Sequence, residues 1–299
     1  MKFLKGFALF ILGSLLFLSL STFGIAFMLN QTILNPDFIV SQVERLDIPS
    51  LAEDMLSEQI PPEAEGFEEY MGEAVSDTIA ENEQWLKDQA RDAAYALYDY
   101  LEGRSQSLSL TVPLEPVKES LRDNLREAVL DNPPQELEGL SPTEIESYVD
   151  GYYQQIAQEI PSTFELNEAS LPPEGMALLE QAKQIIGYFN LSYTALLGLI
   201  LLLILLIILV NREVRGSTRG LGINFLVCGA LSYLGAFAAE KLSGTLLAQA
   251  DMPPYLETWV PQFLSDILAP LVMYSIVLAA VGIILLIVSF AYKPRQPEF

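Results

Sequence analysis

Residues 195–210 read ALLGLILLLILLIILV, and fourteen of these sixteen positions are leucine, isoleucine or valine. Because a helix rises about 1.5 Å per residue, about 20 apolar residues cross the hydrocarbon core of a bilayer. At about −0.3 to −0.6 kcal/mol per residue for insertion, the fourteen side chains contribute about −4 to −8 kcal/mol. The stretch therefore predicts a transmembrane helix, which we place at residues 186–210.

Three further apolar runs have a length that suits a bilayer, at residues 6–29, 221–239 and 267–292. The run at 221–239 is the least apolar, but it must cross the membrane if its neighbours do and both chain ends lie on one side. No Lys, Arg, Asp or Glu lies within any of the four runs. This argues against a pump, because ion and proton pathways generally need buried ionisable groups.

The first run has a second interpretation, a cleaved signal peptide, because Gly24-Ile25-Ala26 resembles a small-x-small cleavage site. The apolar run is 24 residues long, whereas a signal core needs only about 7–15. The length favours an uncleaved anchor, and the cleaved form stays the alternative.

The charged residues between the runs sort by side. All seven lysines and arginines of residues 1–5, 211–220 and 293–299 fall on one side of a four-span chain. The other side holds residues 30–185 and 240–266, with 33 and 4 acidic residues against 8 and 1 basic ones. Basic loops mark the cytoplasmic side. We therefore expect a multi-pass protein of the cell membrane with cytoplasmic N and C termini.

Residues 30–185 have the size of a single domain. The whole chain contains only one cysteine, Cys228, so no disulfide within the chain supports this domain. Apolar residues recur every three to four positions from about Glu63 to Glu102, with a predicted break near Asn82 and an end at Gly103. The predicted fold class is an all-α membrane protein, with four transmembrane helices and a mainly helical extracytoplasmic domain.

One segment of this domain departs from the helical period. Residues 107–114 alternate polar and apolar side chains, a pattern typical of a strand with one buried face. The only plausible partner is Thr163–Leu166, so we expect one short two-stranded pairing. An extended loop across the helices is the alternative.

The second outer segment, residues 240–266, contains an aromatic and apolar stretch after Pro253-Pro254. Tyr255, Trp259 and Phe263 predict a short helix at the membrane interface. The same helix would alternatively cap the underside of the large domain.

A weak candidate ligand or partner surface lies near the end of the long helical pattern. Aromatic rings beside acids can bind sugars or cations. The group consists of Tyr95, Tyr98, Asp99, Tyr100 and Glu102. The alternative interpretation is structural, with tyrosines wedged at a helix end.

A second acidic group has the composition of a possible calcium site. It consists of Glu63, Glu65, Glu68, Glu69, Glu73 and Asp77. Calcium binds about six to eight oxygen ligands, usually from a tight loop that has a glycine where the chain turns sharply. The sequence has no such loop. We therefore expect no metal site and no nucleic-acid partner. The favoured interpretation is a solvated acidic face that keeps the domain off anionic lipid and other acidic molecules.

Small residues one turn apart mark one face of residues 221–239. Cys228, Ser232 and Ala236 predict a helix-packing face within the four-helix bundle, because small side chains let helices approach closely. Self-association is the alternative use of this face, and the oligomeric state stays open.

The sequence offers no histidine and no nucleophile–base set, so we expect neither an enzyme nor a bound cofactor. The favoured function is a non-enzymatic, membrane-anchored binding or scaffold protein in the lipid bilayer. It would present the outer domain to a protein or envelope partner outside the cytoplasm. The alternative is an accessory protein for transport or lipid handling, with a groove between the outer domain and the spans.

Overall fold

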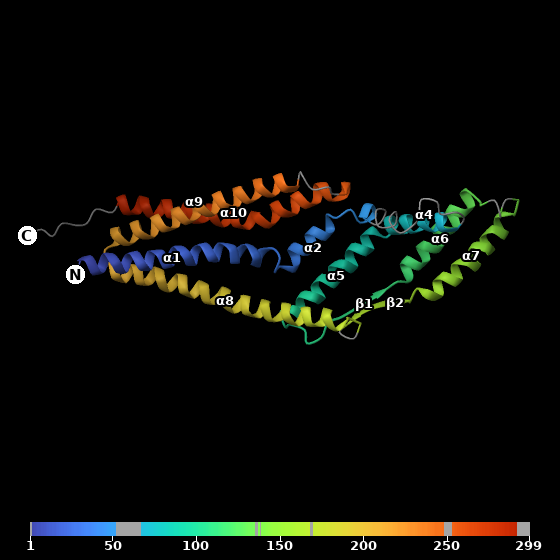
Figure 1. The fold of residues 1–299 in the computed structure, drawn as a ribbon, viewed down its shortest axis with the longest axis horizontal. Helices are drawn as coiled ribbons and strands as arrows, with labels where there is room; N and C mark the ends of the chain where they lie inside the picture. The colour runs from blue at the N-terminus through green and yellow to red at the C-terminus, as the bar shows by residue number, and fades with distance from the viewer. Residues whose placement is uncertain are drawn as a thin grey trace, which may run out of the picture. The chain divides into compact units, whose positions relative to one another are not determined.

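The computed structural model describes residues 2–51, 67–134, 137, 139–167, 170–247 and 253–291. Helices dominate these residues (Figure 1). In chain order they are α1 (Lys2–Gln31), α2 (Pro36–Glu44), α4 (Phe67–Glu81), α5 (Glu83–Leu101), α6 (Glu115–Asp131), α7 (Pro142–Glu159), α8 (Pro173–Asn211), α9 (Val214–Leu247) and α10 (Pro254–Ala291). Two short strands, β1 (Ser109–Pro113) and β2 (Thr163–Asn167), complete the described structure.

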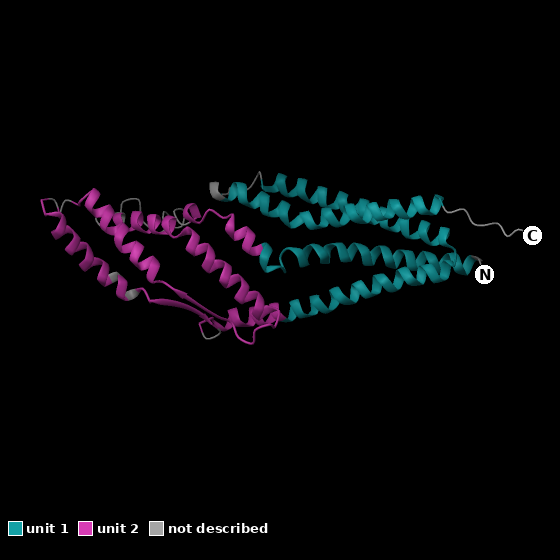
Figure 2. Cartoon of the chain, turned by 180° about the vertical axis from the view of Figure 1, so that it is seen from behind, with its two compact units in different colours: residues 1–38, 184–299 teal, residues 39–183 magenta. Residues whose placement is uncertain are grey.

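The chain forms two compact units (Figure 2). We call residues 1–38 and 184–299 the membrane unit, and residues 39–183 the acidic domain. Four helices of the described chain, α1, α8, α9 and α10, are long and apolar enough to cross a membrane. The predicted fold class is thus confirmed as a helical protein with four candidate membrane-spanning helices and one small sheet.

The core of the membrane unit draws on all four of these helices. Apolar side chains from each helix meet where the helices run alongside one another (Figure 1). The buried members are Leu16, Leu20, Ile200, Leu203, Ile207, Leu221, Cys228 and Leu278. Many other apolar side chains of these helices are exposed, as expected where lipid rather than protein surrounds them.

Two helices of the membrane unit are longer than the apolar runs that predicted them. Helix α9 begins at Val214, only a short turn after the end of α8. Helix α10 contains the predicted interfacial helix and residues 267–291 of the predicted span at 267–292, so the interfacial segment is not a separate helix. The last residue of that predicted span lies outside the described residues. Two prolines, Pro261 and Pro270, lie inside α10. Prolines are tolerated in membrane helices because neighbouring groups compensate the lost hydrogen bond.

Helices α9 and α10 approach each other at backbone distance. A β-carbon on Gly229 would lie 2.7 Å from the Ala279 nitrogen and 2.7 Å from the Ser275 carbonyl oxygen. A β-carbon on Gly282 would lie 2.5 Å from the Leu226 nitrogen. Only glycine fits at these two positions, so both residues allow the close packing of the pair.

The acidic domain has a core of its own, formed where α4, α6 and α7 meet. Its buried members are Tyr70, Ala74, Leu121, Leu125, Val129, Leu137, Ile145, Val149 and Tyr153. The long predicted helix breaks as expected at Asn82, between α4 and α5. The turn after α5 contains Gly103 at φ 75°, a left-handed conformation that favours glycine.

The predicted strand pairing is confirmed. Strands β1 and β2 are antiparallel, with Ser109 opposite Asn167 and Pro113 opposite Thr163. Along β1 exposed and half-buried residues alternate, which is the period that predicted the strand. Helix α8 follows from Pro173 without a break to Asn211, as the continuous helical stripe of the sequence predicts.

Candidate functional site

The acids of the predicted tyrosine group are joined by one guanidinium. Arg104 Nε donates to Asp99 Oδ1 at 2.7 Å, and Arg104 Nη1 donates to Glu102 Oε2. The hydrogen bond from Arg104 to Asp99 also raises the pKa of the guanidinium. Two of the five predicted residues therefore already share a cation within the chain.

The tyrosines of this group are held by contacts of their own. Tyr98 and Tyr100 are buried, and Tyr95 is half-buried. Lys183 Nζ of α8 lies 4.1 Å from the centroid of the Tyr100 ring, which is a cation–π contact. Burial, together with the nearby charge of Glu102, raises the pKa of Tyr98. The geometry resembles the closed helix end of the structural interpretation more than an open ligand site.

Most basic residues of the acidic domain contact partners within it. The domain has 32 acidic and eight basic residues. Seven of the eight have contacts with known partners: Lys87 with Glu83, Arg91 with Glu44 and Asp88, Arg104 with Asp99 and Glu102, Lys118 with Glu115, Arg122 and Arg126 with Asp150, and Lys183 with Tyr100. The eighth, Arg45, also has an interaction partner. The carboxylates of the domain therefore far outnumber the basic side chains that can neutralise them.

One exposed face of α6 shows this excess directly. Glu119, Asp123 and Glu127 recur every four residues and are exposed, and side chains spaced this way share one face of a helix. Among the described residues, no salt bridge reaches any of these three carboxylates. We call this set the α6 acidic face.

The acidic group near residue 70 holds no metal constellation among the residues described. Glu63 and Glu65 of that group lie outside the described residues. Within the described chain, no three His, Cys, Asp or Glu side chains are grouped so that they can hold a metal ion.

The predicted packing face of α9 lies inside the membrane unit. Cys228 and Ala236 are buried and Ser232 is half-buried. Cys228 Sγ lies 3.4 Å from Ser21 Oγ of α1, so this face packs against a neighbouring helix of the same chain. Sequence reasoning missed Gly229 and Gly282, which make the closest approach between α9 and α10.

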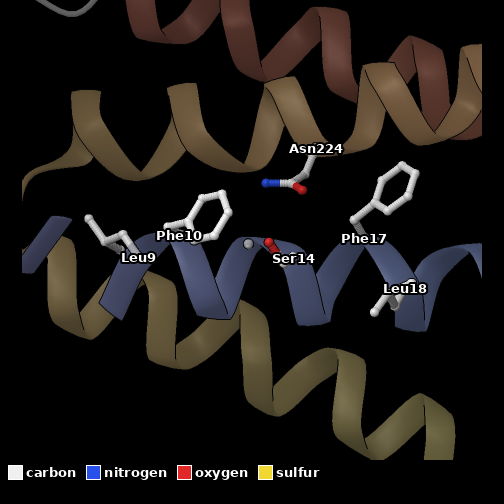
Figure 3. A pocket seen from close by; sticks show the side chains of 7 residues that line it. Leu9, Phe10, Ser14, Phe17, Leu18 and Asn224 are labelled. Carbon is white, nitrogen blue, oxygen red and sulfur yellow. The ribbon is translucent and has the colours of Figure 1, made fainter. Parts of the chain in front are cut away.

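A groove between α1 and α9 was also missed by the sequence reasoning. A cavity of about 510 Å³ is lined by Leu9, Phe10, Gly13, Ser14, Phe17, Leu18 and Asn224. Figure 3 shows Asn224 of α9 and Ser14 of α1 turned toward each other, with Phe10 and Phe17 on either side. The Asn224 amide donates to the Gly220 carbonyl of its own helix at 3.1 Å. Among the described residues, its side chain makes no hydrogen bond across the groove to α1.

A second cavity, of about 260 Å³, adjoins the first and is lined by residues of α1, α8 and α9. It shares Leu9, Gly13 and Asn224 with the first cavity and adds Ile207, Asn211, Gly216, Arg219, Gly220 and Ile223. Beside this second cavity, Lys5 Nζ of α1 donates to the Asn211 carbonyl of α8 at 2.8 Å. The groove thus has an apolar body and one basic end.

The signal for this groove in the sequence is faint, because Gly13 and Asn224 are unremarkable when each is considered alone.

Comparison with known proteins supplies no functional assignment for the chain. No protein-family model, no curated protein and no solved structure matches the chain.

Proposed function

We propose that the protein is a non-enzymatic, membrane-anchored binding or scaffold protein. It presents the acidic domain outside the cytoplasm to a protein or envelope partner with a basic surface. The observation that carries this proposal is the use of seven of the eight basic residues of the domain in contacts within it. The surface left for a partner is therefore dominated by negative charge, which steers and selects a basic partner.

The orientation of the proposal rests on the distribution of lysine and arginine. Residues 1–5, 211–220 and 293–299 are basic, while the acidic domain has 32 acids against eight bases. A non-enzymatic role is supported by the absence of histidine from the chain. The predicted tyrosine group, with its acids already paired to Arg104, supports the same conclusion.

Co-purification from mild detergent tests the proposal. The full chain is isolated through an affinity tag, and co-purified proteins are quantified by mass spectrometry. The test variant combines Glu119→Gln, Asp123→Asn and Glu127→Gln on the α6 acidic face. The matched control combines Glu165→Gln, Glu174→Gln and Glu180→Gln, which removes the same charge at other exposed positions of the domain.

We expect a basic partner that is retained by the wild type and weakened by raised salt, because exposed charges are screened. Recovery should fall more in the α6 variant than in the control. The proposal is contradicted if the wild type recovers no partner. It is also contradicted if the wild type, the α6 variant and the control variant recover a partner equally at every salt concentration.

A further inference from the structure

The groove between α1 and α9 has the length of one bilayer leaflet. Its lining on α1 extends from Leu9 to Leu18. At 1.5 Å per residue this stretch measures about 14 Å. Half of a hydrocarbon core of about 30 Å is about 15 Å. The groove is therefore long enough for an acyl chain from one leaflet and does not need to reach the other.

The polarity of the lining changes along this length. The far end is formed by aromatic and aliphatic side chains, Phe17 and Leu18 among them. The near end contains the amide of Asn211 and the exposed guanidinium of Arg219. A lining that is basic at one end and apolar at the other is complementary to an amphiphile with an anionic head and an apolar chain.

The charge around the near end is positive. Arg212 lies in the turn between α8 and α9, and Arg215 follows in the first turn of α9. Glu213 is the one acid in the turn between the two helices. Lys5 is already bound to the Asn211 carbonyl. Arg219 is the only cation among the described residues that line the groove, so it is the residue placed to meet an anionic headgroup.

We propose that this groove binds an anionic phospholipid, with one acyl chain between α1 and α9 and the phosphodiester at the guanidinium of Arg219. The proposal goes beyond the partner-binding function of the acidic domain and does not depend on it. By the lysine and arginine distribution, the bound lipid belongs to the cytoplasmic leaflet.

The size of the groove favours a lipid chain over a helix. The two cavities measure about 510 and 260 Å³, which is within or near the range of about 300–1,000 Å³ typical of small-ligand pockets. A helix from a second copy has a diameter of about 10–12 Å with its side chains and packs along many turns. The lining instead ends within one leaflet and includes the lone charge of Arg219.

Native mass spectrometry of the full chain in detergent tests this assignment. The probes are dioleoyl phosphatidylglycerol and dioleoyl phosphatidylcholine, which share their acyl chains and differ in net charge. The rim variant is Arg219→Gln. The matched control is Arg215→Gln, which removes the same charge from an exposed residue nearby that is not among the described lining residues.

We expect the wild type to retain one phosphatidylglycerol in preference to phosphatidylcholine. Arg219→Gln should weaken phosphatidylglycerol binding about fivefold, which corresponds to about 1 kcal/mol for one basic residue beside an anionic headgroup. Arg215→Gln should have a clearly smaller effect. Glycerol phosphate, the free headgroup, should not displace the lipid, because it lacks the acyl chain.

Gly13→Leu tests the apolar body of the groove. A β-carbon added to Gly13 would lie 3.3 Å from Asn224 Nδ2, so a leucine side chain here would fill the cavity. Gly6→Leu is the control, because no atom lies within 4 Å of a β-carbon there. Gly13→Leu should abolish retention and Gly6→Leu should preserve it. If Gly13→Leu fails to fold, the comparison of Arg219→Gln with Arg215→Gln decides alone.

Four results overturn the assignment. Equal retention of phosphatidylglycerol and phosphatidylcholine shows that Arg219 makes no selective contact with an anionic headgroup. Equal weakening by Arg219→Gln and Arg215→Gln indicates a diffuse surface charge and no defined site. Displacement by glycerol phosphate indicates a free phosphate site, and a dimer that loses its second copy in Gly13→Leu indicates a helix in the groove.

Discussion

Asp150 of α7 accepts two hydrogen bonds from one guanidinium, that of Arg122 on α6. The distances are 2.9 Å from Nε to Oδ1 and 3.0 Å from Nη2 to Oδ2. Arg126 Nη2 also donates to Oδ1 at 3.1 Å. These bonds, those from Arg122 above all, lower the pKa of Asp150. A single carboxylate thus joins two turns of α6 to α7.

We predict that Asp150→Asn destabilises the acidic domain at pH 7 and that the loss depends on pH. The folded pKa of Asp150 lies below its ordinary value of 3.8. Its contribution is therefore complete above that value and is lost as the pH falls through the folded pKa. Urea unfolding of residues 31–184 should show wild type and variant converging in acid. Asp92→Asn, at an exposed position of α5, is the control and should unfold like the wild type at pH 7. A constant difference at every pH would contradict the prediction.

The acidic domain has its own core, so we expect residues 31–184 to fold alone as a mainly helical protein without metal. Circular dichroism before and after addition of a chelator measures this. A domain that gains its helix content only when calcium is added would show that its acids form a metal site.

Leu125 is fully buried in the core between α4, α6 and α7. Leu125→Ala should lower the free energy of unfolding of this domain by about 2–5 kcal/mol, the usual cost of a buried leucine-to-alanine change. Leu178→Ala removes a side chain that is 66% exposed and should stay within about 0.5 kcal/mol of the wild type. Similar losses in both variants would mean that α6 does not pack as described.

Gly229 is one of the glycines that allow the close approach of α9 and α10. Gly229→Leu should destabilise the full chain in detergent by about 3 kcal/mol or more, because the first side-chain carbon meets backbone of α10 at 2.7 Å. Gly235→Leu on the same helix finds open space and is the matched control. Thermal unfolding followed by size-exclusion chromatography compares the two. Equal melting temperatures would argue against the close approach.

The predicted orientation is testable by cysteine labelling in a Cys228→Ser background. An impermeant thiol reagent applied to intact cells should label Glu119→Cys in the acidic domain and should not label Arg215→Cys between α8 and α9. Permeabilised cells supply the control, because both positions are exposed and should then react. The reverse pattern in intact cells would invert the topology and move the proposed partner to the cytoplasm.

Much of the fold is visible in short stretches of the chain. The run at 195–210 and the alternation at 107–114 are local patterns, and a helix or strand shows its period within a few residues. Asn82 and Gly103 likewise mark their boundaries by residue type. The four candidate spans and the strand pairing were therefore predictable. The extent of α9 and α10 was not, because both helices continue beyond the apolar residues that signal a span.

The candidate sites depended on contacts between distant segments. Asp99 and Glu102 look free in the sequence, and only the folded domain shows Arg104 between them and Lys183 against Tyr100. Gly13 lies in α1 and Asn224 lies in α9, far apart in the sequence. They line one groove because packing sets the rotation of each helix about its axis. Apolar periodicity shows that a helix has a buried face, but the residue that each side chain meets is set by the fit of all four helices together.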